Sequence, residues 1–158
     1  AVPENVIIIG TMNTADQSIA LLDVALRRRF GFRELLPETD LLKNKDIAGV
    51  NLAEWLETLN NRITEYVGRN LQVGHSYLMK NEKTIQNEEQ LLASVRDEIL
   101  PLLQEYCYDD YNTLKAILGA KIVKKDKGGF EPEIFTSRGL EIIIDSMKEM
   151  INGNDQVE

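Results

Sequence analysis

The stretch VIIIGTMNTAD, residues 6–16, decides how this chain is interpreted. Its first four residues are apolar and β-branched, and Gly10 bounds them, which is typical of a strand buried on both faces of a parallel sheet. Ligands in open α/β sheets bind beyond the carboxyl ends of the strands, and Asn13 follows this run closely. The sequence therefore predicts a buried strand over residues 6–9 with a polar, ligand-facing end.

Three adjacent arginines, Arg27, Arg28 and Arg29, lie at the far end of the helix that we expect after Asp16. Neighbours on a helix are about a quarter-turn apart, so at most one or two of these side chains can face a single site. Residues 29–35 then alternate well enough for a second, short strand.

The remaining chain is predicted to be mostly helical. Residues 38–50 are polar and are interpreted as a linker. Apolar residues then recur at helical spacing over 52–67 and over 91–106, and Pro101 predicts a kink or a new first turn in the second stripe. Asn51 is the expected start of the first helix, and Gly68 its end.

Shorter elements are expected toward the C-terminus. A helix over about 110–118 should end at Gly119, and residues 121–129 are typical of a loop or hairpin tip. A last helix follows, capped by Thr136 or Ser137.

Composition and charge narrow the class of protein. The chain is 43% apolar and 28% charged, as in a soluble globular domain, and no apolar run is long enough to span a bilayer. Residues 1–36 are neutral overall, so the remainder carries the net charge of −8. That balance argues against broad binding of a phosphate backbone by this segment. Cys107 is the only cysteine, which excludes an internal disulfide and suggests a reducing cytoplasm and a buried structural thiol.

Four blocks in this order resemble one family. They are residues 2–16, ALRRRF at 25–30, VGHSY at 73–77, and PLLQEY at 101–106 followed by two aspartates. The blocks resemble the AAA+ GTPase subunit of modified-cytosine (5-methylcytosine) restriction systems, the McrB type, over residues 2 to about 120. The implied fold is an α/β remnant, the C-terminal strands of a P-loop AAA+ core at 1–37, followed after the linker by a mostly α-helical lid at 51–158.

The resemblance also implies a function. The whole protein is expected to be a hexameric, GTP-preferring NTPase that uses Mg²⁺ and powers an endonuclease partner, while a separate domain binds DNA. One alternative is an ATP-using AAA+ remodelling or chelatase-like ATPase. Another, from a different class, is a non-catalytic helical interaction module.

Two parts of a nucleotide hydrolase are absent from the sequence. No Gly-Lys-Ser or Gly-Lys-Thr phosphate loop (Walker A) occurs, and the apolar run at 6–9 is not followed by the carboxylates that hold Mg²⁺ (Walker B). We interpret the chain as a C-terminal half, which alone should neither hold a nucleotide tightly nor hydrolyse one.

The resemblance assigns roles to five residues. Asn13 would be the sensor-1 residue, whose carboxamide can hold a γ-phosphate oxygen and the attacking water, although the motif alone also fits a turn residue. Arg28 and Arg29 would be arginine fingers that act on a neighbouring subunit's nucleotide. Asp16, near the nucleotide, would cap a helix or orient the arginines, and a guanine-reading role is disfavoured.

His75 is the fifth residue and the only histidine. The resemblance places it in the lid, where AAA+ proteins keep a phosphate-sensing group, whereas a lone histidine is more often structural. No second histidine or cysteine lies nearby in the sequence, so a metal site is not expected.

Overall fold

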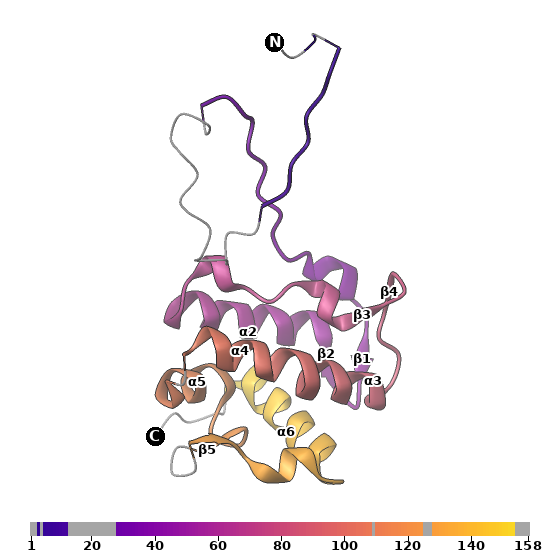
Figure 1. Ribbon diagram of the computed structural model, residues 1–158. Coiled ribbons are helices and arrows are strands. Elements are labelled where there is room, and N and C mark those ends of the chain that lie inside the picture. Colours follow the sequence, from indigo (N-terminus) through magenta and orange to yellow (C-terminus); the bar gives the residue numbers. More distant parts are fainter. Residues whose placement is uncertain (1–2, 4, 13–27, 109, 125–127, 154–158) are drawn as a thin grey trace. The chain divides into compact units, whose positions relative to one another are not determined.

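The computed structural model describes residues 3, 5–12, 28–108, 110–124 and 128–153 (Figure 1). The chain divides into two units, residues 1–34 and residues 35–158. In chain order the elements are η1 (Thr39–Leu42), β1 (Asp46–Ile47), β2 (Val50–Asn51), α2 (Leu52–Tyr66), η2 (Arg69–Leu71), η3 (His75–Leu78), β3 (Met79–Lys80), β4 (Lys83–Thr84), α3 (Glu88–Ala93), η4 (Ser94–Ile99), α4 (Leu100–Tyr106), α5 (Tyr111–Leu118), β5 (Val123–Lys124), β6 (Gly129–Phe130), η6 (Pro132–Phe135) and α6 (Gly139–Asn152).

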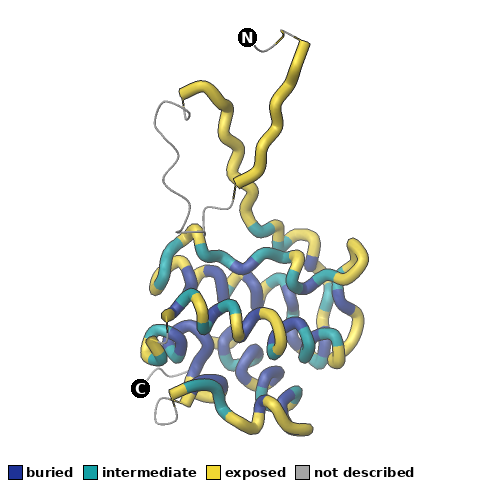
Figure 2. The backbone as a smooth tube through the Cα atoms, in the orientation of Figure 1, coloured by how far each residue is buried: buried dark blue, intermediate teal, exposed yellow. Residues whose placement is uncertain are grey.

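The described residues of the first unit contain no strand. The apolar run at 6–9, predicted to be buried, is solvent-exposed, with Ile7 at 86% and Ile9 at 88% exposure (Figure 2). Residues 29–35, predicted to form a second strand, are likewise exposed and form no strand. A strand of this kind requires neighbouring strands and covering helices, and the described residues of this unit supply neither. The α/β part of the expected fold is therefore not confirmed.

Residues 38–50, expected to be a linker, are folded onto the second unit. They form η1 and the β1–β2 hairpin, and they bury Leu42 and Val50 completely. Ala48 and Gly49 both have positive φ angles, which a tight hairpin turn requires to match the twist of its strands. The few apolar residues of this polar segment thus contribute to the core.

The helix that the sequence predicts from Asn51 is α2, and its ends are those expected. The Asn51 side chain accepts a hydrogen bond from the backbone N–H of Glu54 at 3.1 Å, which caps the helix. Gly68, at φ 116°, ends it and donates its N–H to the carbonyl of Ile63. Helix α5 follows the same rule, because Asp110 caps its start and Gly119, at φ 87°, follows its last residue.

The second apolar stripe forms one helical run that changes type along its length. Helix α3 continues into η4, one segment of π-helix, in which the N–H of Leu100 bonds to the carbonyl of Val95, five residues back. Pro101 then lies in the first turn of α4, where its missing N–H costs no helical hydrogen bond. The new first turn expected at Pro101 is confirmed.

The last helix begins differently from the prediction. Its N-cap is Arg138, and no side chain caps it, whereas Thr136 or Ser137 was expected to do so. Thr136 instead donates its hydroxyl to the carbonyl of Glu133 and belongs to the end of η6. Gly139 is buried at the start of α6, and a Cβ built on it would lie 1.9 Å from the carbonyl oxygen of Ile134. Close contact between η6 and α6, rather than a side-chain cap, defines this junction.

The helices of the second unit enclose one apolar core (Figure 2). Helix α2 contacts both α5 and α6, and α6 also contacts α3. The residues of the two predicted stripes that lie in this core are Leu52, Trp55, Leu56, Leu59, Ile63, Leu91, Val95, Ile99 and Leu103. Helical spacing therefore located the buried faces correctly. None of the described helices is long and apolar enough to cross a membrane.

Candidate functional site

The candidate site is built on Asn60, a buried polar residue of α2 that is 5% exposed. Its side-chain amide donates to the carbonyl of Val73 at 2.9 Å, and its carbonyl oxygen accepts the N–H of Val73 at 2.7 Å. A carboxamide is suited to this pairing because it carries a donor and an acceptor side by side. The pair fixes the backbone of Val73 immediately before the Gly74–His75 segment. Sequence analysis missed Asn60, since its partner lies 13 residues away.

His75 follows at the first position of η3, half-buried. Its Nδ1 accepts a hydrogen bond from the backbone N–H of Glu38 at 2.9 Å. An amide N–H can only donate, so Nδ1 must be unprotonated and the neutral ring carries its proton on Nε2. His75 therefore has a defined tautomer, with its Nε2–H directed away from the Glu38 contact.

The arginine candidates lie in the other unit. Arg28 and Arg29 are solvent-exposed and lie in a turn. Asn13 and Asp16, together with the predicted helix between Asp16 and Arg27, lie outside the described residues. Within the second unit, the structure brings His75 together with the backbone of Glu38, and Asn60 with the backbone of Val73.

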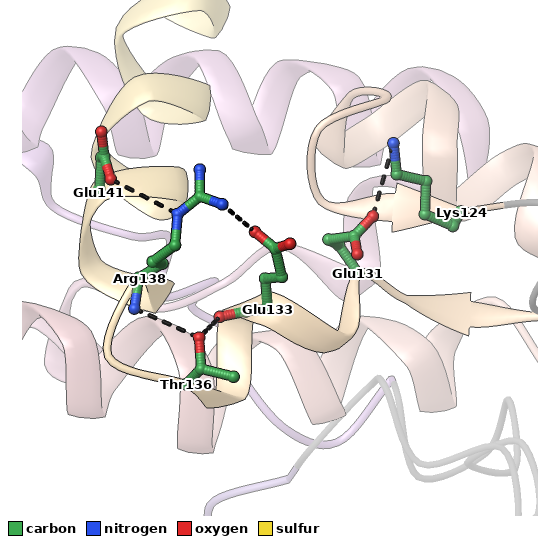
Figure 3. A network of polar contacts seen from close by, with 6 residues as sticks. All are labelled: Lys124, Glu131, Glu133, Thr136, Arg138 and Glu141. Carbon is green, nitrogen blue, oxygen red and sulfur yellow. Dashed lines mark hydrogen bonds and ion pairs between the residues drawn. The ribbon is translucent and has the colours of Figure 1, made fainter.

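A second polar cluster lies near the C-terminus (Figure 3). Arg138 contacts Glu133 at 2.7 Å and Glu141 at 3.9 Å, and Lys124 contacts Glu131 at 3.5 Å. These ion pairs join the β5–β6 hairpin, η6 and α6, and each cation shown has a carboxylate partner. We interpret the cluster as structural, since exposed pairs of this kind contribute about 0–1 kcal/mol each.

Metal-binding geometry is not found in the part of the chain that the structure describes. No group of three or more His, Cys, Asp or Glu side chains lies close enough there to hold a metal ion.

Cys107 is a buried thiol at the end of α4, 5% exposed. Burial raises its pKa from the ordinary 9.0 to about 11, and the charge of Asp110 acts in the same direction. A thiol of this kind is not activated as a nucleophile or ligand at neutral pH. The burial expected for Cys107 is confirmed.

The raised pKa predicts how stability changes at alkaline pH. Between pH 9.0 and about 11 the unfolded thiol loses its proton while the folded one keeps it, so a rise in pH favours the unfolded state. We expect the free energy of unfolding to fall by roughly 1–2 kcal/mol more in the natural chain than in Cys107→Ala over this range. Urea denaturation of both chains at pH 8.5 and at pH 11 measures this difference, and equal losses would contradict the assignment.

Comparison with known proteins supplies the family. A family model described as the alpha-helical lid domain of McrB matches residues 51–115. The chain is also similar to the type IV methyl-directed restriction enzyme EcoKMcrB subunit of Escherichia coli (strain K12), with 39% identity over 123 residues. That alignment covers 69% of this chain and 27% of the relative, so the chain spans about a quarter of the curated protein that it matches.

The chain is therefore McrB-like, and it resembles the C-terminal part of such a subunit. The matched lid begins at the N-cap of α2 and contains Asn60, Val73 and His75. The predicted family is confirmed for this segment.

Proposed function

We propose that this chain is part of an McrB-like subunit of a modification-dependent restriction enzyme. The observation that carries the proposal is the McrB-type lid at residues 51–115, together with 39% identity to a subunit that is named a methyl-directed restriction enzyme. In this proposal the intact protein is a GTP-hydrolysing AAA+ ring that requires Mg²⁺ and drives an endonuclease partner. Recognition of DNA belongs to another domain, consistent with the acidic balance of residues 37–158.

Within that ring the chain supplies three parts. Asn13 acts as sensor 1, with Asp16 beside it, and Arg28 or Arg29 reaches the nucleotide of a neighbouring subunit. The lid carries His75 toward a phosphate group. The apolar run at 6–9, which precedes Asn13, supports this role. Four consecutive exposed apolar residues commonly mark a surface that another segment covers, and a strand within a sheet is covered in this way.

The first test uses the chain by itself. Without a phosphate loop or Mg²⁺ carboxylates in its sequence, it should show no GTP binding by calorimetry at concentrations on the order of 100 μM, and no GTP turnover. The positive control is the intact protein with Mg²⁺, which should bind and hydrolyse GTP in preference to ATP.

Each outcome of this test has a defined meaning. Turnover by the isolated chain would contradict the proposal that hydrolysis requires a phosphate loop and Mg²⁺ carboxylates that this chain lacks. A preference of the intact protein for ATP would favour a remodelling ATPase, and the absence of any nucleotide binding would favour a helical interaction module.

A further inference from the structure

We propose that Asn60 and the backbone N–H of Glu38 are positioning groups that hold His75 as its Nε2–H tautomer, ready to donate to an anionic oxygen. On the function proposed above, on which this inference rests, that oxygen belongs to a phosphate group of the bound nucleotide. The juxtaposition joins three segments, α2, the residues before η1, and η3.

The first positioning step is the contact between α2 and Val73. Asn60 uses both halves of its carboxamide on one residue, so it specifies the position of the Val73 peptide and not merely its distance from the helix. Val73 is itself completely buried, which leaves its backbone no access to water as an alternative partner. Loss of Asn60 would leave two buried backbone groups unsatisfied.

Neighbouring contacts reinforce this position. Thr64, one turn further along α2, accepts a hydrogen bond from the side chain of Gln72 at 3.1 Å. Gly74 is the N-cap of η3, and its carbonyl accepts a hydrogen bond from the backbone N–H of Tyr77 at 3.3 Å. The backbone just before His75 is thus held on both sides.

The second positioning step acts on the ring. With Nδ1 occupied by the Glu38 N–H, the ring cannot present Nδ1–H, and rotation about its own bonds would break a 2.9 Å hydrogen bond. Nε2–H is then the one ring donor left for a ligand. A phosphate oxygen is a suitable acceptor, because hydrogen bonds to charged groups are the stronger class.

Glu38 offers a matched pair of variants. Glu38→Pro removes the backbone N–H, and Glu38→Ala keeps it, while both remove the same exposed carboxylate. The backbone φ of −97° at Glu38 is close enough to the proline range for a modest adjustment. The pair therefore isolates the N–H that binds Nδ1.

The tautomer can be observed directly on this chain, because His75 is its only histidine and gives a single set of ring ¹⁵N resonances. Spectra of the neutral ring, recorded at about pH 8.5, should show an unprotonated Nδ1 and a protonated Nε2 in the natural chain and in Glu38→Ala. Glu38→Pro should show a mixture, because a ring released to water populates both tautomers. Asn60→Ala should also move toward the mixture, and Asn61→Ala, an exposed neighbour on α2, should not.

The functional readout uses GTP binding by the intact protein. We expect Glu38→Pro to bind GTP about tenfold more weakly than Glu38→Ala, and His75→Phe to be weakened to a similar extent. If Asn60→Ala fails to fold, judged by the fluorescence of the single buried Trp55, the Glu38 pair still decides the result.

The two proposals fail in different ways. Equal tautomer ratios and equal GTP affinities in Glu38→Pro and Glu38→Ala, in a protein that binds GTP, would overturn the positioning of His75 and leave the proposed function intact. An intact protein that binds no nucleotide would overturn the proposed function and, with it, the ligand assigned to Nε2–H.

Discussion

Replacing the true arginine finger by alanine in the intact protein should lower nucleotide turnover by about 10³–10⁵-fold. The candidates are Arg28 and Arg29, both solvent-exposed. A guanidinium can neutralise the charge that develops on the transferring phosphoryl group through two parallel hydrogen bonds, which lysine cannot reproduce. Arg28→Ala and Arg29→Ala, measured in separate turnover assays, identify which of the two acts.

Nucleotide binding provides the internal control for this experiment. The proposed finger would act on a neighbouring subunit's site, so each alanine variant should bind GTP nearly as well as the natural protein. A mixture of the inactive variant with a phosphate-loop variant should recover part of the activity, because each supplies what the other lacks. Near-normal turnover in both alanine variants, or no recovery on mixing, would contradict a finger that acts between subunits.

Gly139→Ala should be among the most destabilising single substitutions in the second unit. The added Cβ would lie 1.9 Å from the carbonyl oxygen of Ile134 and 2.8 Å from its carbonyl carbon. Alanine gains at most about 1 kcal/mol of helix propensity over glycine, whereas overpacking against backbone atoms that cannot rotate away costs about 1–3 kcal/mol or more. We expect the cost of the steric clash to exceed the gain in helix propensity, with a net loss of about 2 kcal/mol or more in the free energy of unfolding.

Gly129→Ala is the matched control, since no atom lies within 4 Å of a Cβ built at Gly129. It should change the free energy of unfolding by less than about 0.5 kcal/mol. Urea denaturation followed by Trp55 fluorescence measures both variants, and a loss at Gly139 no larger than at Gly129 would refute the close approach of η6 to α6.

Local signals in the sequence predicted most of the lid. The start of α2 at Asn51 and its end at Gly68 depend on groups within a few residues of one another, as do the cap at Asp110 and the stop at Gly119. The buried faces followed from helical spacing, and the family followed from four short blocks in order. Such features are readable because their physical causes are contained in a single segment.

Only part of the candidate site could be predicted from the sequence. His75 was singled out through the family resemblance, but its hydrogen bond to Glu38 spans 37 residues and has no sequence signal. The same holds for Asn60, whose short polar side chain inside an apolar stripe is not distinctive until Val73 is placed against it. Contacts between distant segments depend on the packing of several elements at once.

The sequence by itself determined the helical segments of the second unit, the two ends of α2, the stop of α5 at Gly119 and the McrB-type family, because these depend on local hydrogen bonds and on the spacing of apolar residues. Tertiary structure alone decided that residues 38–50 join the core, that Gly139 admits no side chain, and which nitrogen of His75 carries the proton. It also decided against burial of the apolar run at 6–9, where propensity favoured a strand. Burial requires partner surfaces, and a strand pattern cannot supply its own neighbours.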